Sequence, residues 1–404
     1  MSGVSLRIAA IAVSALSGLL MASAASAQAT ANTGDLIVDA RLRYESVTQD
    51  GLGDANAVTL RTRLGYETRA WHGFRFLGEV EGVAQLNDEF NDTVNGNTTY
   101  AVVADPEVFE VNRLQVSWSG SEGRRAVLGR QRIVLNNARF VGNVGFRQNE
   151  QTFDALRLEA RPFEHAGFTY IYIDNVRRVF GDDSPQGEWE SDSHVLSADV
   201  DLPWGRASAY GLFLDFGNDA PAQSSQTYGL RWSNEWTAGG FRPRLTLEAA
   251  AQSDYGSNAA SFDLGYQHAD LSVRRDRWTV AVAGERLEGD GARGFATPLA
   301  TLHAFQGWAD VFLTTPPDGV RDLNASLSYA TQPWLANQPV VFTVRAHDFT
   351  DSDGGADFGA ELDASVRFSI SEHIAFEAKA AAFDGEDPRF ADRTKFWWAI
   401  EYRY

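Results

Sequence analysis

Polar and apolar side chains alternate along almost the whole chain, and helical periodicity dominates nowhere. Because successive side chains of a β-strand point to opposite faces, this pattern predicts strands with one apolar and one polar face. In the closing segment, Phe396, Trp398 and Ile400 fall on one face, and Lys395 and Glu401 fall on the other. The sequence predicts 18 such strands, with centres near residues 40, 63, 80, 114, 128, 157, 171, 197, 211, 231, 248, 265, 282, 325, 344, 363, 378 and 399.

The connections between these strands alternate between long and short. The long ones span residues 46–56, 87–106, 131–152, 176–191, 217–225, 253–259, 289–319, 350–356 and 384–392. Long loops at one end of an even number of strands are typical of outer-membrane barrels, whereas a soluble sandwich has no reason to keep them there. We therefore predict an all-β fold, a transmembrane antiparallel up-and-down β-barrel whose last strand pairs with Leu36–Glu45. Apolar faces such as that of Tyr210, Leu212 and Leu214 are expected to face lipid.

The N-terminus predicts export from the cytoplasm. Arg7 is the only charged residue before residue 35, Ile8–Met21 is apolar, and Ala25-Ser26-Ala27 supplies a small-x-small cleavage pattern. This is the pattern of a secretory signal peptide. We expect residues 1–27 to be a cleaved signal peptide and residues 28–404 to form a single barrel domain in the bacterial outer membrane, with both termini periplasmic.

Composition excludes several classes of function. The chain has no Cys, which excludes disulfides and Cys-based metal or nucleophile sites. A formal charge of −19 argues against nucleic-acid binding. No catalytic, metal-binding or nucleotide-binding spacing is present, so we expect neither an enzyme nor a cofactor. Lys379 and Lys395 are the only lysines, and the remaining basic residues are arginines, whose forked guanidinium groups suit anion recognition.

Residues 129–153 form a long loop that is dense in Arg, Asn and Gln. Long barrel loops can fold into the lumen, where guanidinium and amide groups would meet carboxylate or hydroxyl groups of a solute. The alternative is a surface loop whose polar groups satisfy its own backbone. On the first interpretation, Asn143, Gln148 and Asn149 are amide-bearing candidates for the pore.

Residues 298–316 are too apolar for a free outer loop and contain Phe305, Trp308 and Phe312. These rings either present an aromatic surface to sugars or pack the loop onto the barrel, and packing is the favoured interpretation.

Arginines also recur on the polar faces of the predicted strands. They either line a positive wall or pair with inward glutamates and brace the barrel, and the sequence leaves both open. Those on the polar faces include Arg41, Arg43, Arg61, Arg63, Arg69, Arg75, Arg113 and Arg231.

Two stretches resemble the alginate export family of outer-membrane barrels. The first contains Arg139-Phe-Val-Gly-Asn143 and Arg147–Ala155, and the second contains Thr297–His303 and Phe312–Pro316. The resemblance implies an 18-stranded monomer whose arginine-lined lumen passes anionic polysaccharide. This chain is shorter than the characterised exporter. The resemblance implies that the pore residues are Arg113, Arg130, Arg132, Arg139 and Arg147. To these we add Arg41, Arg61 and Arg63 from the polar faces of the strands.

We therefore expect a channel that passes alginate-like anionic saccharides through an arginine-lined pore, in either direction. A general or small-anion porin is the alternative, and an outer-membrane hydrolase is a third hypothesis. The expected partners are the saccharide cargo, outer-membrane lipid and lipopolysaccharide, together with periplasmic export or uptake proteins as candidates.

Overall fold

A computed structural model describes residues 34–334 and 336–404, which form one closed antiparallel sheet. The predicted signal peptide lies outside the described residues. Every predicted strand centre falls within a strand. The strands are β1 (Gly34–Gln49), β2 (Ala55–Thr68), β3 (Phe74–Gln85), β4 (Val108–Ser119), β5 (Arg125–Gln131), β6 (Thr152–Phe163), β7 (Ala166–Arg177), β8 (Glu188–Leu202), β9 (Gly205–Leu214), β10 (Ser225–Glu235), β11 (Arg242–Asp254), β12 (Asp263–Arg275), β13 (Trp278–Leu287), β14 (Val320–Ala330), β15 (Val341–Thr350), β16 (Asp357–Ser369), β17 (Ile374–Gly385) and β18 (Arg393–Arg403).

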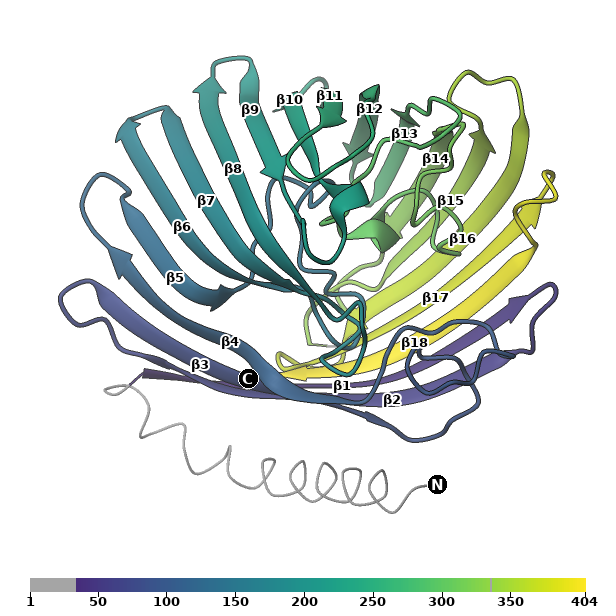
Figure 1. The fold of residues 1–404 in the computed structure, drawn as a ribbon, viewed down its shortest axis with the longest axis horizontal. Coiled ribbons are helices and arrows are strands. Elements are labelled where there is room, and N and C mark those ends of the chain that lie inside the picture. The colour runs from purple at the N-terminus through teal and green to yellow at the C-terminus, as the bar shows by residue number, and fades with distance from the viewer. Residues whose placement is uncertain (1–33, 335) are drawn as a thin grey trace.

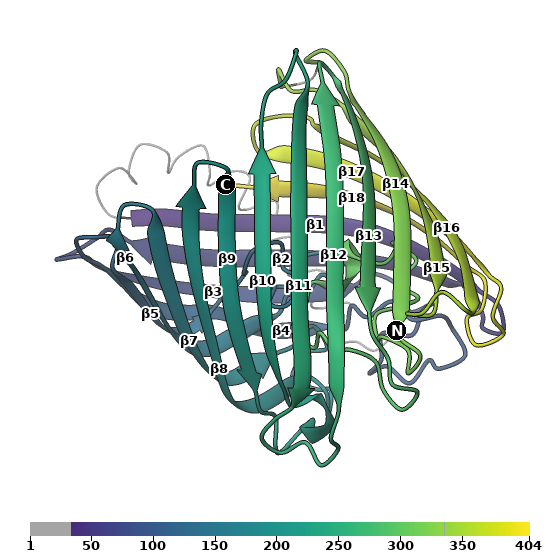
Figure 2. The same cartoon turned by 90° about the horizontal axis from the view of Figure 1, so that it is seen from above.

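Each strand pairs with its neighbours in sequence, and β18 pairs with β1 to close the barrel. Figures 1 and 2 show the resulting ring of strands from two directions. The closing seam runs from Asp39 opposite Arg403 to Gln49 opposite Arg393. It is displaced from the predicted Leu36–Glu45, because β1 continues for four residues beyond Glu45. Closure leaves no strand edge unpaired, as a barrel in lipid requires.

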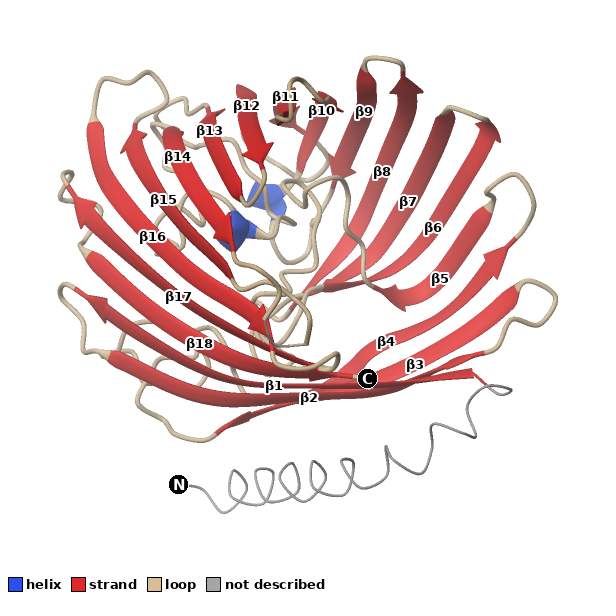
Figure 3. Cartoon of the chain, turned by 180° about the vertical axis from the view of Figure 1, so that it is seen from behind, coloured by secondary structure: helices blue, strands red, loops and turns tan. Residues whose placement is uncertain are grey.

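The long connections lie at one end of the barrel, as predicted. The connection from β1 to β2 lies at the same end but is shorter than predicted, residues 50–54, because both strands extend into the predicted loop. Two long connections turn into the lumen: the first inner loop (residues 132–151) and the second inner loop (residues 288–319), which includes the short 3-10 helix η3 (Leu302–Ala304). Figure 3 shows loops inside the ring of strands. Within the described residues, no helix has the length and apolarity to cross a membrane.

The two faces of the wall differ in chemistry. Large apolar side chains are exposed on the outside, among them Phe109 at 81%, Leu230 at 68% and Leu114 at 63% exposure. Charged side chains such as Arg61 and Glu81 are buried on the inside. A closed sheet with an apolar exterior and a polar interior is the architecture that spans the outer membrane, because every backbone group is paired within the sheet. The protein is an integral outer-membrane barrel.

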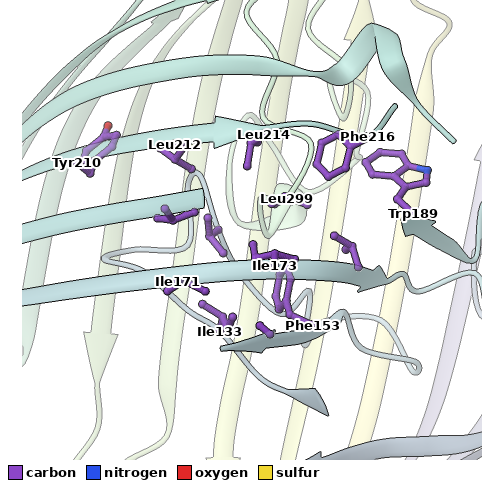
Figure 4. Close-up of a cluster of buried hydrophobic side chains, with 14 residues drawn as sticks. Ile133, Phe153, Ile171, Ile173, Trp189, Tyr210, Leu212, Leu214, Phe216 and Leu299 are labelled. Atoms are coloured by element: carbon purple, nitrogen blue, oxygen red, sulfur yellow. The ribbon is translucent and has the colours of Figure 1, made fainter. Parts of the chain in front are cut away.

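One apolar face points inward, contrary to the prediction for β9. Tyr210, Leu212 and Leu214 are buried and belong to a cluster with residues of β6 to β8 and with Ile133 and Leu299 from the two inner loops. Figure 4 shows this cluster. The alternation correctly predicted the strand but not which face is lumenal, because the inner loops provide an apolar surface inside the barrel.

A second apolar cluster attaches the second inner loop to the opposite wall. Phe312 lies 4.7 Å from Phe349 and 5.0 Å from Phe390 between ring centroids, and it is almost fully buried. For Phe312, this supports the packing interpretation of residues 298–316.

Candidate functional site

The two inner loops bind each other and form one structure inside the lumen. Gly142 N–H donates to the Leu299 carbonyl at 2.8 Å, and Thr301 N–H donates to the Ala138 carbonyl at 3.0 Å. The Gln151 side chain also donates to the carbonyl of Leu299, at 3.1 Å. These bonds satisfy loop backbone groups that would otherwise be buried without partners. Of the two interpretations of residues 129–153, the structure therefore supports a loop that folds into the lumen.

Arg139 anchors this structure to β13. Its guanidinium donates to Glu285 at 2.7 Å and to Thr297 at 3.0 Å, and its side chain is fully buried. Burial acts to lower the pKa of Arg139, but Glu285 and Tyr266 outweigh it and raise the pKa. Since the side chain has no exposed surface, Arg139 holds the loops and does not face the solute path.

Most of the predicted pore arginines are neutralised by carboxylates. One or two acidic groups lie against each of them except Arg41, which has no carboxylate partner among the described residues. The pairs are Arg61 with Asp39 and Glu401, Arg63 with Glu81 and Glu150, Arg113 with Glu79, Arg130 with Asp154, Arg132 with Glu150 and Glu79, Arg139 with Glu285, and Arg147 with Glu45 and Asp310. Buried pairs of this kind brace a structure more than they attract a passing anion.

Glu150 shows how firmly these charges are held. Burial alone would raise its pKa, but the guanidinium groups of Arg63 and Arg132 outweigh burial and hold the pKa at about 2. Asn112 adds a hydrogen bond to Glu150 at 2.7 Å. An irregularity in the β3–β4 register leaves Asn112 without a cross-strand partner and buried. A bulge is not readable from alternation, which is why the sequence did not reveal Asn112.

The predicted amides serve the loop. The Asn143 side chain donates to Glu150 at 2.8 Å, and that of Gln148 donates to Thr59 Oγ1 at 2.8 Å. Asn149 is fully buried and lies 3.5 Å from the carbonyl oxygen of Arg178. Gln148 therefore fixes the first inner loop to β2, Asn143 braces the loop internally, and Asn149 contacts the β7–β8 connection.

Two chambers lie on either side of the inner loops. The inner chamber, about 430 Å³, is on the side of the short turns and is lined by β1 and β15 to β18. The outer chamber, about 420 Å³, is on the side of the long loops and is lined by Arg147, Arg178, Arg393 and apolar residues such as Leu52 and Val179. A further space of about 520 Å³ lies along β6 to β11, and its lining includes Asn136, Asn137, Arg231 and Arg244.

The inner chamber is strongly basic. Its lining has six cationic side chains and two acidic ones, Glu377 and Glu401; the cationic ones are Arg41, Arg43, Arg345, Arg367, Lys379 and Arg403. Among the described residues, no carboxylate oxygen lies within the 4.0 Å ion-pair distance of Arg345, Arg367, Lys379 or Arg41.

Arg41 is the only one of these four that the sequence singled out as a site residue. Its guanidinium donates to Gln148 Oε1 at 2.8 Å and to the Gly145 carbonyl at 2.9 Å, so part of it holds the loop. The sequence analysis did not select Lys379 as a pore residue. Its position beside the strand centre near 378, on the same face as Glu377, could have identified it as a lumenal cation.

Arg178 provides the outer chamber with a cation of the same kind. It lies over the ring of Trp189, 3.8 Å from its centroid, and donates to the carbonyl of Gln186. Burial lowers its pKa to about 10. It remains charged at neutral pH, and in the part of the chain that the structure describes no carboxylate neutralises it.

His303 separates the two chambers. Burial lowers its pKa to about 4, although Asp310 acts in the opposite direction, so the ring is neutral at pH 7. Burial would raise the pKa of Asp310, but Lys395 and His303 outweigh it and hold that pKa well below its usual value. Among the described residues, no group of three or more acidic or imidazole side chains is placed to hold a metal ion.

No family model and no curated protein matches the chain. Solved structures do match it in fold. OpdK of Pseudomonas aeruginosa with vanillate has a TM-score of 0.71 at 12% identity, covering 92% of this chain and 98% of that chain. OccAB3 of Acinetobacter baumannii has a TM-score of 0.72 at 12% identity, covering 93% and 100%. OpdL of Pseudomonas aeruginosa has a TM-score of 0.68 at 15% identity, covering 93% and 99%.

The fold is that of an outer-membrane barrel. OpdK is described as an outer membrane protein of Pseudomonas aeruginosa, and its barrel matches this chain over nearly the full length of both. At these identities the similarity shows the fold alone. The three structures named above are not described as alginate exporters, so they support a general outer-membrane barrel and not the finer resemblance to the alginate export family.

Proposed function

We propose that the chain forms an anion-selective channel for small organic carboxylates in the outer membrane. The observation that carries the proposal is the inner chamber, where Arg345, Arg367 and Lys379 have no carboxylate partner among the described residues. Unpaired cations in a narrow, low-dielectric lumen attract anions and repel cations. The small-anion porin, expected above as the alternative, is thus favoured over the polysaccharide channel.

The rings beside these cations suit a solute with a flat apolar part. Lys379 Nζ lies 4.4 Å from the centroid of Trp308 and 5.2 Å from that of Phe146, and Trp397 lines the same chamber. A benzoate-like anion would place its carboxylate against the cations and its ring against these faces. The structure of OpdK with vanillate, an aromatic carboxylate, supports this choice of solute class.

The size of the chambers argues for a small solute. Spaces of about 430 and 420 Å³ accommodate small molecules, and polymer strands need an uninterrupted passage. The buried ring of His303 lies between them. We therefore do not assign alginate or another polysaccharide as the cargo.

The proposal includes orientation and assembly. The long loops face the exterior and the short turns face the periplasm, which places the inner chamber and the C-terminus on the periplasmic side. Since β1 and β18 close the barrel, a single chain forms a complete pore without a second subunit. Its role is transport and not catalysis.

A planar-bilayer recording tests the proposal. Under a KCl gradient, the reversal potential of the purified channel should have the sign of chloride selectivity, and sodium benzoate at high concentration should block the chloride current. As a control, the cation arginine methyl ester should leave the chloride current unchanged. A cation-selective reversal potential would reject the proposed function.

A further inference from the structure

The ring of His303 lies between the two chambers. Among residues 34–334 and 336–404, it alone lines both the inner and the outer chamber. It projects from η3 in the second inner loop and is 6% exposed. A solute that moves directly from the inner to the outer chamber therefore passes this ring.

Aromatic contacts hold the ring in place. His303 stacks on Phe146 of the first inner loop, with centroids 3.5 Å apart and an interplanar angle of 12°. The edge of Trp397, from β18, lies at a centroid distance of 5.5 Å and an angle of 66°. The partition is thus built from both inner loops and the closing strand.

Hydrogen bonds hold both ring nitrogens. His303 Nδ1 lies 2.8 Å from Asp310 Oδ1, and Asp310 also accepts from Lys395 Nζ at 2.7 Å. A carboxylate accepts, so Nδ1 carries the hydrogen and Nε2 is left as an acceptor. Lys379 Nζ lies 3.4 Å from Nε2 and supplies the donor.

The two lysines of the chain therefore hold opposite sides of the ring in different ways. Lys395 is committed to Asp310 and Glu45, with N–O distances of 2.7 and 3.4 Å. Lys379 has no carboxylate within ion-pair distance among the described residues, and it faces the inner chamber. An ammonium group prefers a carboxylate to a neutral imidazole, because a charge-assisted bond to an anion is the stronger one.

We infer that His303 is a gate that the solute itself releases. A carboxylate that enters the inner chamber binds Lys379 and withdraws its hydrogen bond from Nε2. The ring, then hydrogen-bonded only to Asp310, turns away from Phe146 and joins the two chambers. This inference rests on the proposed function and adds to it the residue that controls passage.

Bilayer recordings of His303→Ala, with benzoate as the probe, test the gate. The unsubstituted channel should have a low chloride conductance that rises when micromolar benzoate reaches the inner chamber, before block sets in at higher concentration. His303→Ala should show a several-fold higher conductance without benzoate and no further rise with it. The matched control is His268→Ala, which removes a histidine of β12 that lines neither chamber; its conductance should equal that of the unsubstituted channel.

Lys379→Met provides a second variant that leaves the ring stack intact. It should also conduct more without benzoate and lose the benzoate response. If His303→Ala and Lys379→Met conduct as the unsubstituted channel does, the gate is rejected. The reversal potential separates this failure from that of the proposed function: an anion-selective channel with unaltered conductance in both variants rejects the gate alone, and a cation-selective one rejects the function.

Discussion

The lumen has two basic walls that differ in what lies opposite their cations. Along β1 to β6, arginines such as Arg63 and Arg113 meet Glu81 and Glu79. Along β15 to β17, Arg345, Arg367 and Lys379 have no such partner among residues 34–334 and 336–404. The cations of the first wall form ion pairs that brace the barrel, whereas those of the second wall are available to bind a solute. The number of arginines on a barrel face therefore says little about pore charge until their pairing is known.

Acidic residues are present on the second wall but are engaged elsewhere. Asp363 lies opposite Arg345 in the β15–β16 register, yet it lies against the ring of His347, with Nε2 and Oδ2 3.5 Å apart. Glu361 accepts the backbone N–H of Ala309 at 2.8 Å and so holds the second inner loop. The loop and the histidine thus take up the carboxylates that would otherwise neutralise this wall.

The largest effect is expected at a paired arginine. Arg139→Met removes the partner of the buried Glu285 and should destabilise the barrel by about 3–5 kcal/mol, without changing ion selectivity. Urea unfolding in detergent micelles measures the loss. The double variant Arg139→Met/Glu285→Gln should recover most of it, and an equal loss in the double variant would show that the ion pair is not the cause.

An intermediate effect is expected when the two lysines are compared. Lys379→Met should weaken benzoate binding by about tenfold, since a hydrogen bond to a charged group contributes roughly 1.5–3 kcal/mol, while stability changes little. Lys395→Met should instead lower stability, because Asp310 and Glu45 lose their partner. Benzoate titrations and urea unfolding of both variants measure the two quantities. A loss of stability in Lys379→Met together with weaker benzoate binding in Lys395→Met would contradict this comparison.

A pH effect follows from the pKa of about 4 for His303. The ordinary pKa of a histidine is about 6.5, so the unfolded chain binds the proton more readily than the folded chain does. The neutral ring therefore contributes its full stabilisation of the closed loops only above pH 6.5. This contribution is lost as pH falls from 6.5 to 4. The groups facing the ring are Asp310, Lys379 and, through Asp310, Lys395 and Arg147; Asp310 stays ionised in this window.

Conductance should therefore be constant from pH 8 to 6.5 and rise as pH falls toward 4. His303→Phe keeps an aromatic ring and should have no such rise. The same rise in His303→Phe would assign the titration to another group.

The smallest effect is expected outside the lumen. Arg389 pairs with Asp318 and Asp387, and its side chain is 47% exposed. Exposed pairs contribute about 0–1 kcal/mol, so Arg389→Gln should leave stability and selectivity nearly unchanged. A shift in reversal potential as large as that of Lys379→Met would mean that charge anywhere on the protein sets selectivity.

The sequence predicted the strands because alternation is a local property, and all the strand centres could be read from it. It did not predict which arginines are paired, because the pairing depends on loops that fold across the lumen. Arg139 and Glu285 are 146 residues apart, and nothing local to either residue indicates the other. The inward face of β9 was missed for the same reason, since the loops that cover it lie elsewhere in the sequence.

The reversal potential of two matched sets of variants tests the central claim most directly. Arg345→Gln/Arg367→Gln/Lys379→Gln removes the three unpaired cations of the second wall, and Arg130→Gln/Asp154→Asn removes one neutralised pair from the other wall. The account predicts that the triple variant loses its anion preference and that the double variant keeps it. Retention of anion preference by the triple variant, or its loss in the double variant, would contradict the account.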